Sequence, residues 1–334
     1  MTGLVEIESL EWDGLLEKLV CADAYLLRLY VESACVLDSG RPVLLHLGDR
    51  GGDVVFPAIV RELPSGGACD VTTPYGYGGP VATGPDPPTA RFWSLYQDWC
   101  EESGIVTSFI RFHPLFANQR SAPEGVRVEP LSATVGWRLR LPDLLDAMHD
   151  HHRRACRKAS RAGVSVTARE SPGELSAFAS LYEETMSRVG AREFYLFPPS
   201  YWEALTRLGA RLVLFDAEVG GEVVASALCF ATPPWLHFHL GATAGRGRAL
   251  GAGNLVFFEA ARWARDRGYE RFHLGGGVGG REDSLLTFKR RFDPGGLVEC
   301  AVGKAVHDAA AYRTLAGRAA DDLGGFFPAY RRAH

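Results

Sequence analysis

The sequence predicts an α/β (α+β) protein made of two successive copies of one layout. The first observation is the length, because 334 residues exceed one ordinary hydrophobic core and fit two domains of roughly 150 residues each. The second is the composition of 46% hydrophobic and 23% charged residues, which is ordinary for a globular protein and excludes a disordered or collagen-like chain. The third is the order of predicted elements, which is the same in both halves.

The first half contains two strand-like runs, at residues 43–47 and 53–60, joined by a turn at Gly51–Gly52. Residues 89–103 have the pattern of a helix that ends at a glycine, and residues 105–112 then form a buried strand.

The second half repeats this order. Strand-like runs at 211–219 and 222–231 flank a second glycine pair, a helix at 254–267 ends at a glycine, and a strand follows at 269–274. In each predicted helix a tryptophan lies five residues before the terminating glycine. We therefore expect a duplicated hairpin–helix–strand unit. Further helices are expected at 143–162, 172–189, 199–208 and 307–322.

Charge and targeting signals narrow the class of protein. A net charge of −4 argues against non-specific coating of nucleic acid, which needs many phosphate contacts. The acidic start MTGLVEIESLEWDG has no apolar signal-peptide core, and no run of about 18 apolar residues follows. The seven scattered cysteines resemble buried thiols of a reducing compartment. These features predict a cytoplasmic protein without a membrane span.

Two segments of the first half carry candidate binding residues. The run TTPYGYGGP contains Tyr75, Gly76, Tyr77 and Gly78, and it is interpreted either as a tight structural loop or as a rigid wall of a substrate groove. In FIRFHPLFAN, Arg111 and His113 lie where a buried strand emerges into a loop. That histidine is either a structural residue or a group that orients or deprotonates an amine.

A basic stripe follows on the helix predicted at 143–162. Arg153, Arg157 and Arg161 repeat every four residues, with Arg154 and Lys158 beside them. Asp150 is the single acidic residue nearby, so we do not expect the helix to neutralise its own stripe. The stripe suits two or three phosphates of a nucleic-acid strand or a diphosphate; the alternative is a solvated basic face.

Two glycine-rich segments of the second half suggest anion chemistry. Arg248, Gly251 and Gly253 form an R-x-x-G-x-G turn, which is similar to the coenzyme A pyrophosphate loop of GCN5-related N-acetyltransferases (GNATs). Further on, HLGGGVGGREDSLLTFKRRF ends in consecutive cations between two phenylalanines. A lysine held in a cleft there would stabilise a developing oxyanion. That segment presents Phe288, Lys289, Arg290 and Arg291.

His237, His239 and His273 are the histidines that raise the question of a metal site. Alternating strand positions place the first two on one face, which makes zinc conceivable. No carboxylate or cysteine lies at a convincing spacing, so histidines packed beside aromatic rings are the favoured interpretation, and no metal is predicted.

Together these segments resemble the Fem family, the aminoacyl-tRNA-dependent transferases that build peptidoglycan cross-bridges, with their FemX-like and BioF2-like relatives. TPYGYGGP, RFHP, RRACRKASRAGV, FHLGGG and SLLTFKRRF occur in the family's order, over roughly residues 40–300. The resemblance implies two tandem GNAT-like domains. The first is expected at 1–140, completed by about 306–334, and the second at 141–305, with no room for a long coiled-coil arm.

The resemblance further implies peptide-bond formation, in which the amine of a peptide or peptidyl-nucleotide acceptor attacks the ester of an aminoacyl-tRNA. The acceptor is a peptidoglycan precursor or a peptidyl natural product, and no cofactor is expected. Lys289 would neutralise the oxyanion or the tRNA terminus, Phe288 would contact the terminal adenosine, and the basic stripe with Arg290 and Arg291 would bind tRNA. The Tyr75–Pro80 loop, Arg111, Arg192 and Tyr195 would contact the acceptor. His113 departs from the pattern, because cell-wall enzymes usually carry Asp there.

Two other functions stay open. The R-x-x-G-x-G turn would suit an acyl-CoA-dependent N-acyltransferase, and the same fold could serve as a binding module without chemistry. Charge reversal on the stripe should weaken a tRNA reaction and spare a CoA reaction, whereas a bulky residue at Gly251 should do the opposite.

Overall fold

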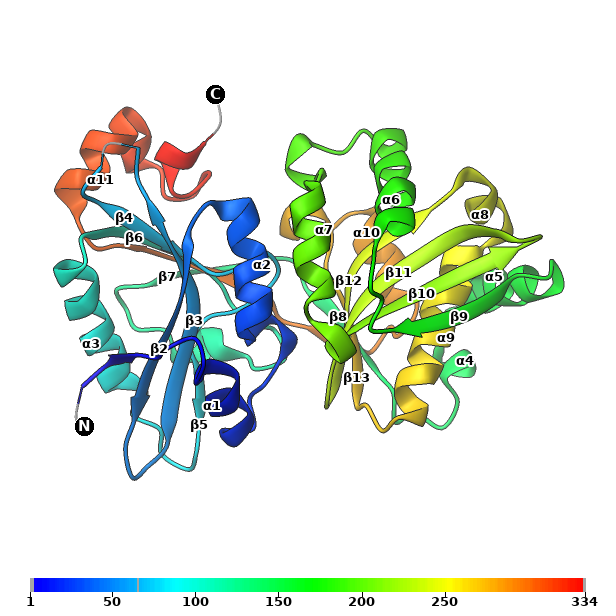
Figure 1. The fold of residues 1–334 in the computed structure, drawn as a ribbon, viewed down its shortest axis with the longest axis horizontal. Helices are drawn as coiled ribbons and strands as arrows, with labels where there is room; N and C mark the ends of the chain where they lie inside the picture. Colours follow the sequence, from blue (N-terminus) through cyan, green and yellow to red (C-terminus); the bar gives the residue numbers. More distant parts are fainter. Residues whose placement is uncertain (1–2, 65, 333–334) are drawn as a thin grey trace. The chain divides into compact units, whose positions relative to one another are not determined.

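The computed structural model describes residues 3–64 and 66–332, which form two compact units (Figure 1). The first unit comprises Met1–Leu131 with Glu299–His334, and the second comprises Ser132–Val298. The sequence placed the corresponding limits near 140 and 305. In the structure β8 (Thr134–Arg138) pairs within the second unit's sheet and β15 (Ala301–Val306) within that of the first.

The first unit contains an eight-stranded sheet in the order β1-β2-β3-β4-β6-β15-β7, with β5 paired to β3. Antiparallel pairing dominates, and β4 with β6 is the parallel pair. Its remaining strands are β1 (Val5–Glu6), β2 (Arg41–Gly48), β3 (Asp53–Glu62), β4 (Cys69–Thr72), β5 (Val81–Thr83), β6 (Ile105–Arg111) and β7 (Arg127–Pro130).

Alternating side chains of β2 and β3 pack into two cores, one on each face of this sheet. Val43, Leu45 and Phe56 pack with α3 (Thr89–Glu102), whereas Leu44 and Val55 pack with α1 (Trp12–Lys18) and α2 (Arg28–Asp38). Because both faces are covered, these strands are apolar almost throughout, which explains their continuous hydrophobic pattern in the sequence.

The C-terminal segment belongs to the first unit. β15 lies between β6 and β7, and α11 (Ala309–Ala316) follows it. Further on, Arg331 Nε donates to Asp70 Oδ2 at 2.9 Å, and the hydroxyls of Tyr330 and Thr107 lie 2.7 Å apart. The helix predicted at 307–322 is shorter than expected, because the chain passes into a 3-10 turn at Gly317, where φ is +54°.

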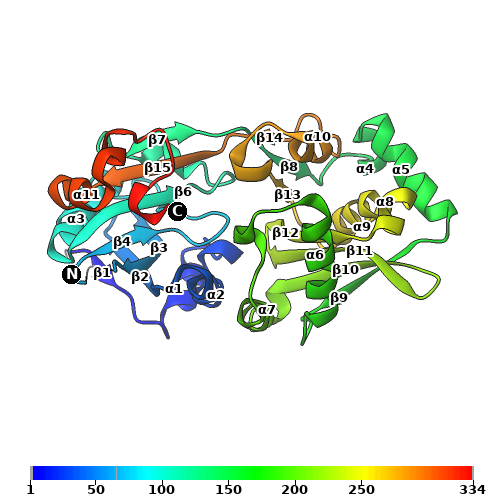
Figure 2. The same ribbon diagram turned by 90° about the horizontal axis from the view of Figure 1, so that it is seen from above.

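The second unit repeats the plan with a seven-stranded sheet in the order β14-β8-β13-β12-β11-β10-β9 (Figure 2). The predicted hairpin, helix and strand are β10–β11, α9 and β13. The strands are β9 (Ser165–Glu170), β10 (Leu212–Val219), β11 (Glu222–Thr232), β12 (Trp235–Thr243), β13 (Arg271–Gly275) and β14 (Leu297–Val298). The helices are α4 (Leu144–Ala147), α5 (Asp150–Arg161), α6 (Ser176–Val189), α7 (Pro199–Thr206), α8 (Gly245–Leu250), α9 (Ala252–Asp266) and α10 (Ser284–Arg290).

The predicted α/β class is confirmed, and the longest helix among the described residues is α9, so no coiled-coil arm is present there. The prediction of one continuous helix over 143–162 is wrong in one respect. It breaks into α4 and α5 at Met148 and His149, where the His149 ring accepts from the His151 amide at 3.1 Å and the His149 amide donates to Arg291 O at 2.8 Å. The break directs the start of α5 onto the end of α10.

The apolar side chains of the helices are buried in the hydrophobic cores of the two units. Among residues 3–64 and 66–332, no helix combines the length and hydropathy that crossing a bilayer requires.

Candidate functional site

The parallel strands β12 and β13 are paired over a short stretch and then part. Trp235, Leu236 and His237 oppose Arg271, Phe272 and His273, and no further pair follows. In the first unit the equivalent parallel strands, β4 and β6, are paired over four residues, and a bridge between Gly78 and Phe112 closes them again further on. The second unit therefore differs from the first in leaving its parallel strands unpaired beyond His237.

Lys289 lies where those strands part. Its Nζ donates to the carbonyl of Gly276, just after β13, at 2.8 Å, and lies 5.3 Å from the centre of the Phe238 ring on β12. The side chain is only 5% exposed, and no described carboxylate is within ion-pair distance. Burial lowers the pKa of Lys289 to about 7, against a smaller raising effect of Asp283. A buried ammonium with a carbonyl partner alone is a costly arrangement, and such costs concentrate at functional sites.

The loop before α10 is shaped to hold this lysine. Asp283 begins the helix, with its Oδ1 accepting from the Leu286 amide and its Oδ2 from the Val278 amide, both at 2.8 Å. Gly277 is required because a Cβ there would lie 2.2 Å from Arg281 O. After α10, Asp293 accepts from Arg138 Nη2 at 2.7 Å and Nε at 2.8 Å. Asp283 thus ties the start of the short helix to the preceding loop, and Asp293 ties the segment after the helix to β8.

Helix α5 packs against the same segment. His152 Nε2 donates to Phe288 O at 2.8 Å, and its ring lies 4.8 Å from that of Phe288 and 4.4 Å from that of Phe292. Burial lowers the pKa of His152 to about 4, so the imidazole is neutral at pH 7. The ring of Phe288 is half-buried among these aromatic side chains.

The basic stripe of α5 separates into two groups. Arg153 is ion-paired with Asp150, which corrects the expectation that the helix leaves its stripe unneutralised, and Lys158 donates to Ala249 O at 2.6 Å. Arg154, Arg157 and Arg161 are exposed, and the described residues offer them no ion pair. The three exposed guanidinium groups are thus available to an anion. Of the other expected cations, Arg290 lies 3.7 Å from Glu282, and Arg291 is half-buried.

The turn containing Arg248, Gly251 and Gly253 is not the open glycine loop that the sequence suggested. A helical turn, α8, precedes Gly251, which has a φ of +80° and begins α9. A Cβ on Gly251 would lie 3.0 Å from the carbonyl oxygen of Ala155 on α5, whereas one on Gly253 would meet only Thr243 Oγ1, at 3.5 Å. Gly251 therefore has a packing role of its own, and Gly253 is the cleaner place to test ligand binding at this turn.

In the first unit, the Tyr75–Pro80 loop is fastened from several sides. Asn118 Nδ2 donates to the carbonyls of Gly78 at 2.9 Å and Pro80 at 3.0 Å. The Tyr30 hydroxyl donates to Tyr75 O. Gly76 has a φ of +102°, and a Cβ there would lie 2.4 Å from the Tyr25 ring. The ring of Tyr77 stands edge-on to that of Tyr25, with the ring centres 5.2 Å apart. These contacts are compatible with both interpretations, a tight structural loop and a wall of a substrate groove.

We expect Asn118→Ala to lower the free energy of unfolding of the first unit by about 3 kcal/mol. Its buried amide satisfies both loop carbonyls, and its Oδ1 also accepts from the His113 amide at 2.8 Å. Chemical denaturation measures the change. Gln119→Ala is the control, because no described group bonds its side-chain oxygen, and it should change stability by less than about 1 kcal/mol. An equal loss of unfolding free energy in both variants would contradict the stabilising role of the Asn118 hydrogen bonds.

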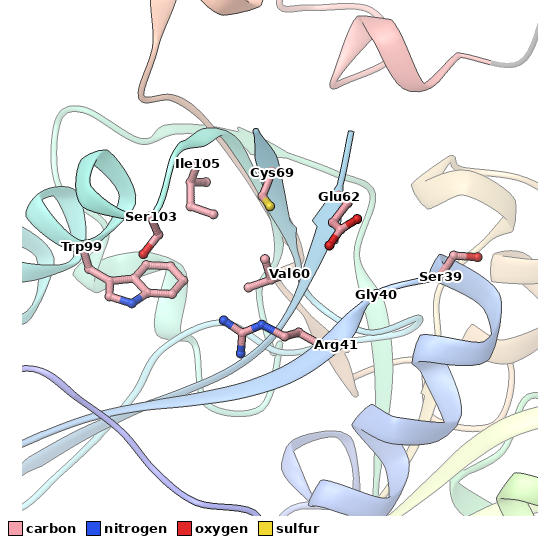
Figure 3. A pocket seen from close by; sticks show the side chains of 9 residues that line it. All are labelled: Ser39, Gly40, Arg41, Val60, Glu62, Cys69, Trp99, Ser103 and Ile105. Atoms are coloured by element: carbon pink, nitrogen blue, oxygen red, sulfur yellow. The ribbon is translucent and has the colours of Figure 1, made fainter. Parts of the chain in front are cut away.

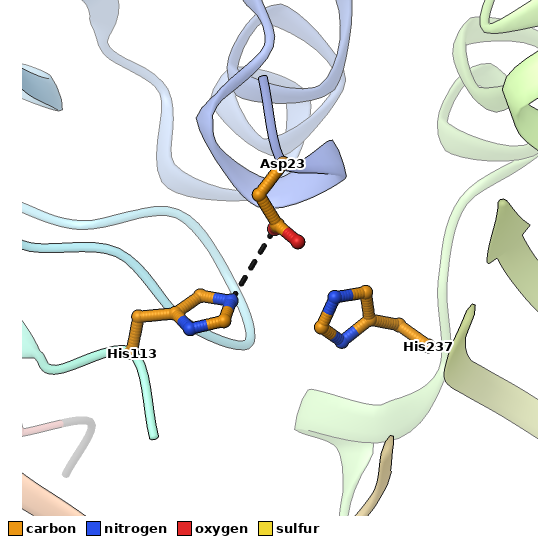
Figure 4. A group of neighbouring side chains, drawn as sticks. All are labelled: Asp23, His113 and His237. Carbon is orange, nitrogen blue, oxygen red and sulfur yellow. Dashed lines mark ion pairs between the residues drawn. The ribbon is translucent and has the colours of Figure 1, made fainter. Parts of the chain in front are cut away.

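His113 and Arg111 both have partners within the first unit. His113 Nε2 lies 3.3 Å from Asp23 Oδ1, and its Nδ1 accepts from the Phe116 amide at 3.4 Å. Figure 4 marks the Asp23–His113 ion pair with a dashed line. Arg111 Nη1 donates to Thr73 O at 2.9 Å, and burial lowers the pKa of this guanidinium.

The remaining expected contacts lie elsewhere. Arg192 and Tyr195 lie at the 3-10 turn Glu193–Tyr195 between α6 and α7, where Arg192 is exposed and Tyr195 half-buried. A pocket of about 320 Å³ opens in the first unit, where Arg41, Glu62, Cys69 and Trp99 face it (Figure 3). None of the sequence-predicted site residues lines that pocket.

The three histidines on β12 and β13 take part in two different side-chain contacts. His237 Nδ1 lies 3.3 Å from His273 Nδ1, and His239 Nε2 lies 2.8 Å from the Tyr201 hydroxyl. Sequence reasoning passed over the positioning residues His152, Asp283 and Asn118. Asp283 was detectable as a helix N-cap before SLL, and Asn118 ends the segment FIRFHPLFAN.

Comparison with known proteins assigns the fold. Residues 147–290 match the model of the acetyltransferase (GNAT) domain family, and a search of curated proteins finds no match. The second unit thus has the GNAT fold, and the chain is a tandem GNAT-like protein in its fold, as the sequence predicted. In particular, it is similar over almost its whole length to the crystal structure of FemX, with 13% identity, a TM-score of 0.70, and coverage of 93% of this chain and 99% of that chain.

Two other solved structures share the tandem arrangement. One is the C-terminal domain of a putative lysylphosphatidylglycerol synthetase from Agrobacterium fabrum, with 15% identity, a TM-score of 0.58, and coverage of 91% of this chain and 93% of that chain. The other is a tandem GNAT protein from the clavulanic acid biosynthesis pathway, with 12% identity, a TM-score of 0.52, and coverage of 91% and 98%. The Fem-like resemblance is confirmed for the fold.

Proposed function

We propose that this protein is a Fem-like aminoacyltransferase that moves an amino acid from aminoacyl-tRNA to the amine of a peptide acceptor. One observation supports this above all: Lys289 places a buried ammonium, with a backbone carbonyl as its hydrogen-bond partner, where β12 and β13 part. A fixed positive charge in a dry site stabilises the oxyanion that forms when an amine adds to an ester.

The reaction needs positioning and charge stabilisation, because the ester is already activated. The acceptor amine adds to the ester carbonyl, and Lys289 turns from Gly276 O to the carbonyl oxygen as negative charge develops there. The tetrahedral intermediate then expels the ribose oxygen of the tRNA, which leaves as a hydroxyl. The proposal assigns no metal or organic cofactor to this step.

The donor is proposed to be a tRNA because α5 presents Arg154, Arg157 and Arg161 as exposed cations. This helix bonds directly to α10 through His149 and His152, so its arginines are held in a fixed relation to Lys289. The Tyr75–Pro80 loop with Arg111 is proposed to bind the acceptor, which is a peptidoglycan-precursor peptide or a related peptidyl metabolite.

An acyl-CoA-dependent N-acyltransferase is the second candidate. The match of residues 147–290 to a GNAT acetyltransferase domain favours it, together with the glycines at the start of α9. Gly253→Val tests it, because a side chain there meets little of the protein and would obstruct a pyrophosphate at the helix N-terminus.

Charge reversal of Arg154, Arg157 and Arg161 to Glu should reduce kcat/KM with charged tRNA by at least tenfold at low salt. It should also make the negative slope of log kcat/KM against log salt shallower by about 2, since each single-stranded phosphate contact contributes about −0.7 to that slope. The measurement is transfer of radiolabelled amino acids from total charged tRNA to a panel of amine-bearing peptides, with an RNase control.

The matched control reverses Arg140, Arg246 and Arg262, three exposed arginines that already pair with glutamates of their own unit. It changes the net charge equally and should leave the salt slope unaltered. Product formation that resists RNase, or that occurs with acetyl-CoA and not with charged tRNA, would overturn the tRNA assignment in favour of the second candidate.

A further inference from the structure

The pocket of the first unit lies at one end of its sheet, beside the last turn of α3. Arg41, Val60 and Glu62 line it from the antiparallel strands β2 and β3, and Trp99 lines it from α3 (Figure 3). Val60 is buried in the core that packs against α3, and Glu62, two residues further along the strand, points to the same face. A volume of about 320 Å³ is in the range of small-ligand sites.

Several polar groups that face this pocket have no partner in the part of the protein that the structure describes. The Glu62 carboxylate forms no ion pair or hydrogen bond with a described residue, and the same holds for hydrogen bonds of the Ser103 hydroxyl and the Trp99 Nε1. Burial raises the pKa of the Cys69 thiol, so this part of the wall is uncharged at neutral pH. The pocket therefore presents an unpaired carboxylate beside an aromatic ring.

The second unit contains the same aromatic ring with a cation on it. Trp99 and Trp263 each lie four residues before the C-cap of their helix and five before the glycine that follows. In the second unit the C-cap is Arg267, whose guanidinium lies 4.2 Å from the centre of the Trp263 ring and pairs with Glu170 at 2.9 Å. In the first unit the C-cap is Ser103, and no lysine or arginine among the described residues lies over the ring.

We propose that this pocket binds a small molecule with a guanidinium group at one end and a carboxylate at the other, of which free arginine is the simplest example. The guanidinium stacks on Trp99 and pairs with Glu62. A planar guanidinium suits both contacts, because it stacks on aromatic faces and its N–H groups form a fork that matches a carboxylate. The site goes beyond the proposed transfer reaction and does not depend on it.

Arg41 accounts for the carboxylate of the ligand. Its Nη1 pairs with Glu6 Oε1 at 2.5 Å, which leaves its other N–H groups available to an anion. This guanidinium repels a ligand that carries only positive charge, whereas it attracts a ligand carboxylate. Arg41 lies opposite Val60 in the register of β2 and β3, so it is a diagonal neighbour of Glu62. A ligand with opposite charges at its two ends therefore contacts both side chains.

Calorimetric titration of the full-length protein with L-arginine tests the proposal. We expect saturable binding, which Glu62→Gln should weaken by at least about tenfold because it removes the charged partner of the guanidinium. Ser103→Arg should weaken binding at least as much, because it places a cation of the chain itself at the position that Arg267 has in the second unit. Thermal unfolding checks that each variant is folded.

Two matched control variants should bind arginine as the wild type does. Glu124→Gln replaces an exposed glutamate of the same unit that is outside the pocket, and Ser94→Arg adds the same charge to an exposed position of the same helix, also outside the pocket. Binding that Glu62→Gln and Ser103→Arg leave unchanged would place arginine elsewhere on the protein and overturn the proposal.

Ligand analogues test the two ends of the molecule separately. L-Citrulline, which has a neutral head of similar shape, and agmatine, which lacks the carboxylate, should each bind at least about tenfold more weakly than arginine. Arg41→Gln should weaken the binding of arginine and not that of agmatine. Equal binding of arginine and citrulline would overturn the cation site, and equal binding of arginine and agmatine would overturn the role of Arg41. A folded wild-type protein without saturable arginine binding overturns the whole inference, and the transfer assay tests the proposed function independently of it.

Discussion

Replacing Lys289 with methionine should lower kcat by about 10²–10³-fold while the protein stays folded. Methionine has a similar length and suits the aromatic surroundings of Phe238, so the variant removes the charge with little change in packing. A single oxyanion-stabilising donor is worth roughly that factor in acyl transfer. Steady-state transfer to a peptide acceptor measures the loss.

The pH dependence of the ratio of wild-type to Lys289→Met kcat/KM is the control for this prediction. Because burial lowers the pKa of Lys289 to about 7, the wild-type advantage requires a proton that is lost above that pH. The ratio of wild-type to Lys289→Met kcat/KM should therefore fall about tenfold per pH unit above pH 7 until the ammonium no longer contributes. The acceptor amine titrates equally in both proteins and cancels in the ratio. A ratio that is independent of pH would contradict a cationic role.

The same lysine should make the stability of the second unit rise with pH. The folded-state pKa is about 7 against an ordinary 10.5, so the unfolded chain binds more protons between these values. The penalty of burying the ammonium is complete below pH 7 and is relieved as pH rises towards 10.5. Between pH 7 and 9.5 the wild type should gain about 3 kcal/mol relative to Lys289→Met.

Denaturant unfolding at several pH values, followed by tryptophan fluorescence, tests this difference. At pH 7 Lys289→Met should be the more stable protein, since it buries no charge, and the gap should narrow at higher pH. A constant gap would show that Lys289 keeps its ordinary pKa in the folded chain. Loss of activity together with gained stability would identify the lysine as a group retained for function.

Local pattern was enough to predict the duplicated hairpin, helix and strand of each unit. The hairpins, α3 and α9 follow from alternating or helical apolar spacing ended by glycine, and these signals are contained within a few residues. Tertiary contacts decided the rest. The break at His149 depends on Arg291 O, and the helical turn before Gly251 packs against Ala155. Neither partner is adjacent in sequence, so periodicity alone predicted one unbroken helix and an open loop.

In the candidate site, too, some features could be predicted from the local sequence and others depend on tertiary contacts. The cluster of cations in FKRR is evident from the sequence. The burial of Lys289 and the exposure of Arg157 are not, because they depend on how α10 and α5 pack. The sequence predicts that Arg153 belongs to a stripe without ion pairs, but in the structure it pairs with Asp150, three residues before it. The histidine pair could not be distinguished from isolated packed rings, because His237 and His273 meet through strand register.

The position of β15 determines the order in which the chain can be completed during translation. This strand lies between β6 and β7, yet it is synthesised after every residue of the second unit. A ribosome therefore releases all of Ser132–Val298 before the first sheet can receive its inner strand. The second unit can finish folding while β6 and β7 still present open edges, and chains that stall before residue 301 would expose those edges to aggregation.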